Sequence, residues 1–368
     1  MLKFSFKKNQ LSAPIQMVSN AVDKRQLLPI LSSLLVRFQN NQLQLTATDL
    51  EIEFTAFIPF EGTAPEAPFT IPAKKFLDVL RTLDDEDVLN LKIFETNLQV
   101  ICGSSQFKFP FLSPTTFPLI QTPSWTQEIV IPKQSLLRLL ESTAFAVSQQ
   151  DIRIFLNGLL FECDELGLTT VGADGHRMAI SKYQQPLTCA KERFIFPRKG
   201  VTELLRFLNS VPDETVKLYL HPNLFRIETT AYVFTSKLID AQYLPYQQAI
   251  PRQLQTFVMV EVDVLKRALA RILIVANDRS RPVILNIDTG QFSFLAANQE
   301  QEEVIESIDA TVDGPSLKIG LNPVYLLEVL NVFKTSHVRL SFHTPDTSIL
   351  VESLDDETYQ YIIMPMKI

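Results

Sequence analysis

The sequence is poor in glycine. It has 10 glycines among 368 residues, under half of the usual share of about 7%. They form neither a GxGxxG nor a GxxxxGK[ST] pattern, and the closest pair is Gly172 and Gly175. Dinucleotide and P-loop sites need glycine where the backbone approaches a phosphate. We therefore expect neither kind of nucleotide site and no cofactor.

Cysteines and long apolar runs are also scarce. Cys102, Cys163 and Cys189 are odd in number and far apart, which favours neither a disulfide framework nor a metal site and suits a reducing cytoplasm. The charge-free run 109–127 contains four prolines, so it cannot span a membrane as a helix. The first residues lack the apolar core of a signal peptide. These features predict a cytoplasmic protein without metal.

Self-similarity is the most informative feature that is present. FTIPAKKFLDVLRTL (69–83) aligns with FIFPRKGVTELLRFL (194–208) at an offset of 125, and LKIGLNPVYLLEVLNVF (317–333) is a third copy. The same offset relates FSFKKNQL (4–11) to IVIPKQSL (129–136). Several segments that share one offset indicate three copies of one domain of about 120 residues.

The repeat predicts the domains and the fold class. We assign the domains to residues 1–125, 126–250 and 251–368. In each copy a short alternating strand precedes a helix with apolar residues three and four apart, and further short strands follow. The pattern then recurs, which predicts an α+β fold with two β-α-β-β-β halves per domain. The proline-rich joints 109–127 and 241–256 are expected to be semi-rigid.

Charge is unevenly distributed. The net charge is −7, and the third copy holds most of the acidic excess, partly in NQEQEEVIESID (298–309). Many basic residues fall on the predicted helices, among them Lys74, Lys75, Arg81, Arg138, Arg198, Lys199, Arg206, Lys266, Arg267 and Arg271. A solvated helix face is one interpretation. Recurrence of these bases in successive copies favours a surface for a polyanion.

Catalytic motifs are not found. The four histidines have no partner at HExxH or CxxC…H spacing, and there is no GxSxG. In ADGHRMA (173–179), Asp174, His176 and Arg177 crowd a tight turn. Because binding groups favour loops on rigid scaffolds, we interpret this turn as a binding site and the protein as no enzyme.

The C-terminal segment TYQYIIMPMKI (358–368) is apolar nearly to its end. Tyr359–Ile363 is expected to be a final strand, and Pro365 cannot continue its hydrogen bonding. This would leave Met364, Met366 and Ile368 unpaired. Methionine suits surfaces that accept several partners, so the tail is predicted to be a binding edge.

Several segments together resemble one family. LPILSSLLVRFQNNQLQLTATDLEIE (28–53), TVGADGHRMAIS (170–181), FTSKLID (234–240), NQEQEE (298–303) and YIIMPMKI (361–368) are similar to the bacterial DNA polymerase III β subunits, the sliding clamps. The resemblance covers the whole chain and implies the DNA clamp fold. In that family three domains form a crescent, and two crescents close head to tail into a ring around duplex DNA.

The resemblance also implies a function and partners. It implies a non-catalytic processivity factor that encircles double-stranded DNA without sequence preference and tethers polymerases at high effective concentration. A clamp loader opens the ring with its own ATPase. Replicative and repair polymerases and other repair proteins bind through short linear motifs, and no membrane is involved.

The resemblance carries over to individual residues. The peptide cleft corresponds to Leu156, Gly175, His176, Arg177, Met178, Pro245, Ser348, Ile362, Met364, Pro365 and Met366. DNA contacts correspond to Arg25, Lys74, Gln150, Arg198 and Lys199. The dimer interface corresponds to Phe107 and Phe109 meeting Ile274 and Val275, with Lys75 facing Glu300 and Glu303. Gln248 falls near a position where the family commonly has Arg.

A nuclease and a non-DNA scaffold are the two alternative functions. A nuclease would need clustered acids that bind a divalent metal, but the acidic runs 84–87 and 355–357 fit loop tips. A non-DNA scaffold or adaptor with three similar domains is the remaining alternative, and it gives no role to the helix-borne bases.

Overall fold

The structure is a computed structural model that describes residues 2–22, 28–63, 65–276 and 282–368. The chain forms two compact units. The first comprises Met1–Lys133 and Thr202–Leu238, and the second comprises Gln134–Val201 and Ile239–Ile368. The helix α4 (Arg198–Ser210) begins in the second unit and continues in the first.

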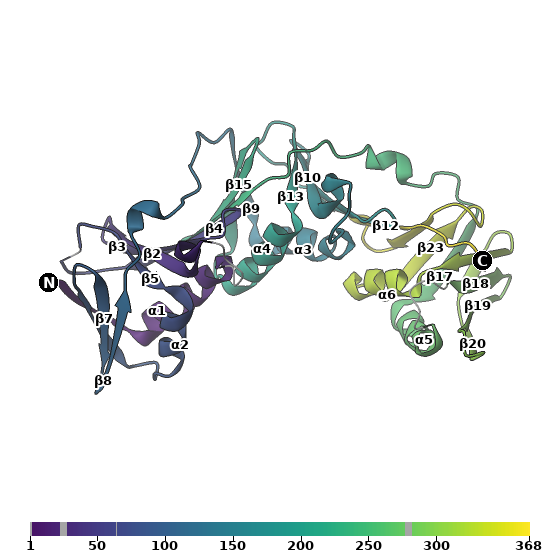
Figure 1. The fold of residues 1–368 in the computed structure, drawn as a ribbon. Helices are drawn as coiled ribbons and strands as arrows, with labels where there is room; N and C mark the ends of the chain where they lie inside the picture. The colour runs from purple at the N-terminus through teal and green to yellow at the C-terminus, as the bar shows by residue number, and fades with distance from the viewer. Residues whose placement is uncertain (1, 23–27, 64, 277–281) are drawn as a thin grey trace. The chain divides into compact units, whose positions relative to one another are not determined.

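The first unit contains two antiparallel sheets with helices packed on them (Figure 1). The larger sheet has the order β5 (Phe69–Pro72), β2 (Ser33–Gln39), β3 (Gln42–Thr48), β4 (Ile52–Pro59), β16 (Tyr232–Lys237), β15 (Leu224–Glu228), β14 (Thr215–His221) and β9 (Gln127–Pro132). The smaller sheet has the order β1 (Leu2–Lys7), β6 (Val88–Ile93), β7 (Asn97–Cys102) and β8 (Ser105–Pro110). The helices α1 (Lys8–Val18) and α2 (Ala73–Arg81) contact each other.

Sequence periodicity explains these elements. In α2, Ala73, Phe76, Leu77 and Leu80 are buried, the spacing expected where one helix face covers a sheet. In β4, buried and less buried residues alternate along the whole strand, as a strand with one core face requires. Phenylalanine fills the core between the layers, because Phe54 and Phe234 lie with ring centroids 4.6 Å apart and neither is exposed.

The second unit repeats this arrangement (Figure 1). Its larger sheet has the order β13 (Glu192–Pro197), β10 (Gly158–Asp164), β11 (Gly167–Ala173), β12 (Arg177–Tyr183), β25 (Tyr359–Ile363), β24 (Ile349–Ser353), β23 (His337–Phe342), β17 (Thr256–Glu261) and β21 (Thr311–Asp313). Its smaller sheet has the order β20 (Glu303–Ile308), β19 (Gln291–Ala297), β18 (Val283–Asp288) and β22 (Leu317–Leu321). The helices are α3 (Lys133–Glu141), α5 (Val262–Val275) and α6 (Pro323–Val332).

The element order confirms the predicted fold class. A strand, a helix and three strands follow one another six times along the chain, and the third copy adds the short strand β21. Neighbouring copies are connected by strand pairing as well as by proline-rich linkers, because β4 pairs with β16 and β12 pairs with β25. Each larger sheet is therefore built from two copies of the repeat. No helix in the described part of the chain is long and apolar enough to cross a membrane.

Candidate functional site

Two joints of the same kind connect successive copies. In each, the last strand of one copy's first half pairs antiparallel with the last strand of the next copy's second half. In the first joint, β4 with β16, Phe54 lies opposite Phe234. In the second joint, β12 with β25, Ala179 lies opposite Tyr361. The pairing is the same, but the second joint carries a large pocket.

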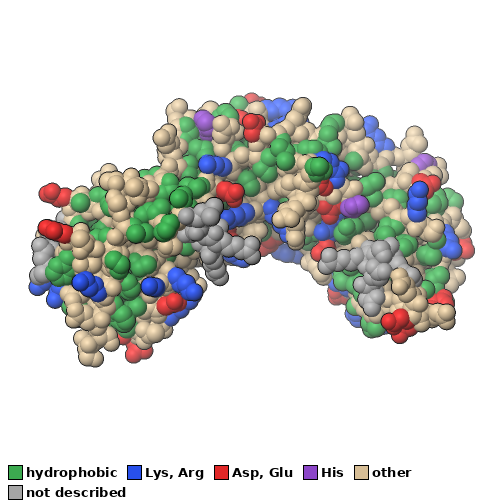
Figure 2. Space-filling model, in the orientation of Figure 1, with side chains coloured by type: hydrophobic (Ala, Val, Ile, Leu, Met, Phe, Trp, Pro, Cys, Tyr) green, Lys and Arg blue, Asp and Glu red, His purple; other side chains and the backbone are tan. Residues whose placement is uncertain are grey.

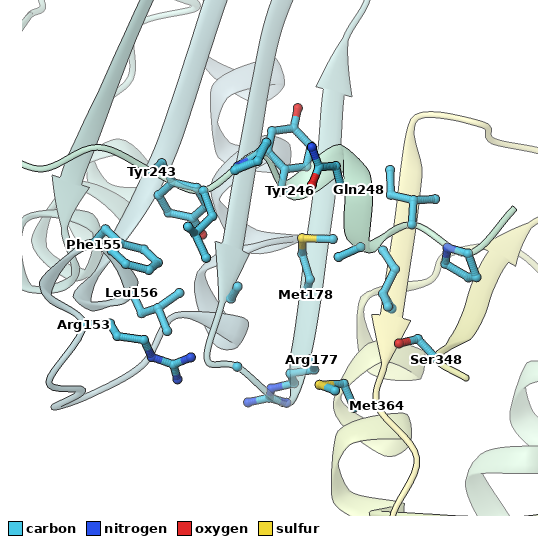
Figure 3. Close-up of a pocket in the computed structure, with 18 of the residues that line it drawn as sticks. Arg153, Phe155, Leu156, Arg177, Met178, Tyr243, Tyr246, Gln248, Ser348 and Met364 are labelled. Atoms are coloured by element: carbon cyan, nitrogen blue, oxygen red, sulfur yellow. The ribbon is translucent and has the colours of Figure 1, made fainter. Parts of the chain in front are cut away.

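The pocket beside the second joint has a volume of about 780 Å³. Five segments form its walls: the 3-10 helix η5 (Ile154–Asn157), the turn between β11 and β12, the linker before β17, the turn between β23 and β24, and the end of β25 with the residue that follows it. Figure 3 shows Phe155, Leu156 and Tyr243 on one side of Met178, with Ser348 and Met364 on the other. Leu156 and Met178 are buried, while the side chain of Met364 is about half exposed. Apolar side chains thus dominate a concave site of the size that holds small ligands.

Most of the residues assigned to the cleft meet here. Those that line the pocket are Leu156, Gly175, Arg177, Met178, Pro245, Ser348, Ile362 and Met364. His176, Pro365 and Met366 adjoin it in sequence but are not among the lining residues. The ring of His176 lies parallel to that of Tyr325, at a centroid distance of 6.5 Å.

The turn between β11 and β12 is fixed by its own side chains. Asp174 Oδ1 accepts hydrogen bonds from the backbone N–H groups of His176, at 2.9 Å, and Arg177, at 3.0 Å. Gly175 has a φ of +88°, and a Cβ atom there would lie 2.5 Å from Arg153 Nη2. Glycine suits this backbone conformation, and its lack of a Cβ atom lets the guanidinium of Arg153 lie close against the turn.

Arg177 is anchored on every side. Its Nε bonds to Asp174 at 3.1 Å, its Nη1 bonds to Glu328, and its Nη2 donates to the carbonyl of Phe145 at 2.9 Å. Its guanidinium also lies 4.5 Å from the centroid of the Tyr325 ring. Two carboxylates therefore neutralise Arg177, whose side chain is 10% exposed.

Arg153 is a pocket residue that the sequence did not reveal. Its Nε and Nη2 donate to the carboxylate of Asp151 at 3.0 and 2.9 Å. These hydrogen bonds are the main cause that lowers the pKa of Asp151 to about 2. The pair is thus ionised on both sides at neutral pH. No motif surrounds Arg153, so only the fold places it at the pocket.

The C-terminal tail is more ordered than expected. The N–H of Met364 donates to the carbonyl of His176 at 2.8 Å, which extends the joint by one bond. Met366 then pairs with Gly320, and its N–H donates to that carbonyl at 2.8 Å. The prediction that Met364 and Met366 are unpaired was therefore wrong, because the backbone of each is hydrogen-bonded. A Cβ on Gly320 would lie 2.7 Å from the carbonyl of Met366, so the small residue permits this contact.

The linker between β16 and β17 forms a further wall that was predicted only in part. Tyr243 and Tyr246 are buried against the sheet, whereas the resemblance assigned only Pro245 of this segment to the cleft. The hydroxyl of Tyr246 donates to Glu162 on β10, and Glu162 forms an ion pair with Arg193 at 2.7 Å. Burial is the first cause that raises the pKa of Tyr246, so this hydroxyl stays a donor. Two tyrosines in a charge-poor segment were the available signal.

The residues assigned to DNA contact are Arg25, Lys74, Gln150, Arg198 and Lys199. Arg25 lies outside the described residues. Lys74, Gln150 and Lys199 are exposed, whereas Arg198 is half-buried and donates to the carbonyl of Val147 at 2.9 Å. Figure 2 shows Lys and Arg interspersed with Asp and Glu on the visible face. Among the described residues no group of three His, Cys, Asp or Glu side chains could hold a metal ion.

The residues assigned to the dimer interface come from the strands β8 and β20, the helices α2 and α5, and the turn before β20. β8 ends the smaller sheet of the first unit, and β20 ends that of the second. On β8, Phe107 is half-buried and stacks on Phe109, while Phe109 is buried. Near β20, the side chain of Ile274 is 74% exposed and Val275 is half-buried. The charged residues Lys75, Glu300 and Glu303 are all exposed.

Comparison with known proteins identifies the family. The chain matches the N-terminal, central and C-terminal domain models of the DNA polymerase III beta subunit over residues 2–121, 130–245 and 247–367. It is 37% identical to the beta sliding clamp of Vibrio cholerae and 33% identical to that of Escherichia coli K12, with all of each chain covered.

Solved structures agree with the family models. The DNA polymerase III subunit beta from Pseudomonas aeruginosa superposes with a TM-score of 0.96 at 33% identity over all of both chains. A sliding clamp from the same organism, bound to griselimycin, gives a TM-score of 0.95 at 33% identity over 100% of this chain and 99% of that one. The chain therefore belongs to the family of bacterial DNA polymerase III β subunits, the sliding clamps.

Proposed function

We propose that the chain is a DNA sliding clamp. It forms a homodimeric ring around duplex DNA and tethers replicative and repair polymerases, without chemistry of its own. Family membership over the full length of the chain carries this proposal. The protein works on DNA inside the cell. The three domains are assigned to 1–125, 126–250 and 251–368.

The two internal joints support the ring. Each joint pairs the last strands of two halves. The last strands of the two remaining halves, β8 and β20, each lie at a sheet edge. These two strands are the equivalents of β16 and β12. A second copy that offers its β8 to β20 would therefore make a third joint of the same kind. The two faces of this joint are different, so copies assemble head to tail, and the ring closes when both joints form.

The repeat also predicts the register of the third joint. Phe107, Phe234 and Tyr361 are each the third residue of their strands and lie opposite Val100, Ile227 and Val351 of the neighbouring strands. In each copy, a carbonyl at the turn before the last strand of the first half accepts the N–H of an equivalent residue: Asp49, Asp174 or Asn298. Two residues after the one that supplies this carbonyl come Phe54, Ala179 and Val304, respectively, so these three positions are equivalent. Because Phe54 faces Phe234 and Ala179 faces Tyr361, Val304 should face Phe107 of the partner subunit.

Side chains at both edges fit this joint. In the same register Glu303 faces Lys108 of the partner subunit, which places opposite charges directly across from each other. We propose that Phe107 and Phe109 contact Ile274 and Val275 of the partner subunit. We also propose that Lys75 faces Glu300 and Glu303 across the joint. Phe234 and Tyr361 are fully buried, and the third joint would bury half-exposed Phe107 in the same way.

DNA would be held mainly by topology. Lys74 and Lys199 are exposed at the starts of α2 and α4, and Gln150 is exposed on a loop. With Arg198 and Arg25, these residues are assigned to phosphate contacts. Such contacts carry no sequence information and weaken as salt rises. The clamp therefore slides, and a tethered polymerase rebinds the primer end at high effective concentration.

The pocket of the second joint is assigned to partner peptides. Leu156, Met178, Ile362 and Met364 form a surface for apolar anchor residues, and anchors in desolvated pockets contribute most of the energy of small interfaces. Clamp loader, polymerases and repair proteins would share this site.

Retention on DNA tests the function. The protein is loaded by a clamp loader onto nicked circular DNA, separated from free protein, and the DNA is then cut once with a restriction enzyme. A ring stays on the circle and is released when the ends appear. A scaffold or adaptor that does not encircle DNA would not be retained on the circle, and a conventional DNA-binding protein would remain bound after cutting.

A further inference from the structure

The charged groups around the pocket are not balanced. Three charged side chains line it: Arg153, Arg177 and Asp346. Arg153 is paired with Asp151, and Arg177 is paired with both Asp174 and Glu328. Both guanidinium groups are thus neutralised by the chain itself. With Asp346 included, four carboxylates accompany these two guanidinium groups, so the charges at and directly beside the pocket sum to a negative value.

Asp346 has no such partner. Its side chain is exposed, and it makes no hydrogen bond or ion pair with any residue that the structure describes. It lies in the turn between β23 and β24, next to the pocket residues Thr347 and Ser348. A ligand in the pocket would therefore meet a free carboxylate at this wall.

The turn holds Asp346 in place. Thr347 Oγ1 accepts the N–H of Thr344 at 2.9 Å and donates to the Thr344 carbonyl at 3.0 Å. The N–H of Thr347 donates to the same carbonyl at 3.2 Å. Pro345 fixes φ directly before Asp346. A side chain on an ordered turn loses little conformational entropy when it binds a ligand. The carboxylate of Asp346 can therefore attract or repel a ligand charge at a small entropic cost.

The wall across the pocket from Ser348 is apolar, so it would orient a bound peptide. Phe155, Leu156 and Tyr243 form an apolar surface across Met178 from Ser348, and Gln248, above Met178 in the view, is polar but uncharged (Figure 3). Asp346 lies in the same turn as Ser348, so an extended peptide with an apolar anchor against Met178 that continues toward Ser348 would run toward Asp346.

We infer that Asp346 makes the pocket select partner segments that carry a Lys or Arg beside their apolar anchor, and disfavour segments with an acid there. This inference rests on the proposed peptide-binding function of the pocket. A cation would pair with the free carboxylate, whereas an acid would be repelled. Because Asp346 is exposed, the expected preference is modest, roughly two- to fivefold in Kd for Lys over Gln.

Matched peptides test this selection. Fluorescence anisotropy measures the binding of one labelled peptide with Leu and Phe anchors. A single neighbouring residue is varied among Lys, Gln and Glu and moved through the positions on both sides of the anchors. Wild type is compared with Asp346→Asn, which keeps the shape and removes the charge. The matched control is Asp355→Asn, since Asp355 is an exposed acid beyond the opposite end of β24.

The expected order of affinity at one flanking position is Lys, then Gln, then Glu. The order should collapse in Asp346→Asn, persist in Asp355→Asn, and weaken between about 50 mM and about 300 mM salt. Equal binding of the three peptides at every position, or an unchanged preference in Asp346→Asn, would overturn the inference while leaving the pocket's function intact. If the Gln peptide does not bind wild type at all, both the pocket's function and the inference fail.

Discussion

The two joints between repeats share their strand pairing but differ in what covers them. At the first joint, the linker after β8 is bound to one paired strand and to the strand next to the other: Glu53 on β4 accepts the N–H of Ile120 at 2.9 Å, and Arg226 on β15 donates to Thr122 at 2.8 Å. At the second, the linker is bound farther out, by Tyr246 to Glu162 on β10 and by Gln255 to Phe342 on β23. The second joint is thus spanned by its linker and keeps a pocket beneath it.

This difference indicates how one copy of a duplicated joint can become a binding site. Duplication supplies the same joint more than once, and the joint itself is a structural element. At the first joint two phenylalanines fill the pairing, and Phe117 of the linker is buried. At the second, Ala179 occupies the place of Phe54, and the linker residues Leu244, Pro245 and Gln248 line the pocket. A binding site arises where the linker leaves room, so the first joint should matter for stability and the second for binding.

The largest expected effect is at the first joint. Phe234 is fully buried between Phe54 and Phe207, so Phe234→Ala should lower the free energy of unfolding by about 3–5 kcal/mol. Urea denaturation followed by circular dichroism measures this loss. Peptide affinity of the folded fraction should be unchanged. A loss below about 1 kcal/mol would mean that the first joint is not a rigid core element.

The proposed third joint should respond next. Ile274→Ala combined with Val275→Ala removes apolar surface that is exposed or half-buried within one chain. The dimer should weaken by about 2 kcal/mol, or roughly thirtyfold in Kd, while the melting temperature of the domains stays nearly constant. Sedimentation equilibrium over a concentration series measures the shift to monomer. A large fall in melting temperature with an unchanged dimer would instead show that these residues belong to the core.

A smaller effect is expected at the second joint. Met364 lines the pocket, and its side chain is 49% exposed, so Met364→Ala should weaken binding of an apolar-anchored peptide about tenfold and change unfolding by less than about 1 kcal/mol. Leu354→Ala is a control, because Leu354 is a similarly exposed apolar residue of the same domain that does not line this pocket. Equal affinities for wild type and Met364→Ala would remove Met364 from the site.

The smallest effect is a pH dependence at the first joint. Burial raises the pKa of the Glu53 carboxyl above its ordinary value. The folded chain therefore binds this proton more tightly than the unfolded chain does. Stability from this group should rise as pH falls through the raised pKa towards about 4.5, and should be lowest above it. In urea denaturation, the stability of wild type relative to Glu53→Gln should rise as the pH is lowered from 7.5 to 5. A fall in relative stability over the same range would contradict a raised pKa at Glu53.

Much of the fold was predictable from the sequence because the chain contains three copies of the repeat. The β-α-β-β-β halves and the α+β class follow from periodicity, and the phenylalanine cores follow from composition. The sharing of sheets between copies did not follow, since β4 with β16 and β12 with β25 are pairings between distant segments with no local signal. Periodicity identifies an edge strand but not its partner.

The site was predictable only in part for the same reason. The DGHR turn and the apolar tail are local patterns, and the structure brings Arg177 and Met364 together at one pocket. Arg153, Tyr243 and Tyr246 reach it from loops and a linker whose sequences are unremarkable. The pairing of Met366 with Gly320 depends on a strand some forty residues away, so no reading of the tail alone could have supplied it.

Cross-linking across the third joint tests the central claim that one joint is used three times. In the proposed register Ser105 faces Glu306 of the partner subunit. The variant Ser105→Cys with Glu306→Cys, treated with a short bis-maleimide, should give covalent dimers that stay on nicked circular DNA in high salt until the circle is cut. Wild type, which contains Cys102, Cys163 and Cys189, and Ser105→Cys with Glu303→Cys, about 10 Å out of register, should cross-link far less. Equal cross-linking in all three proteins, or dimers that leave intact circles, would contradict the proposed third joint.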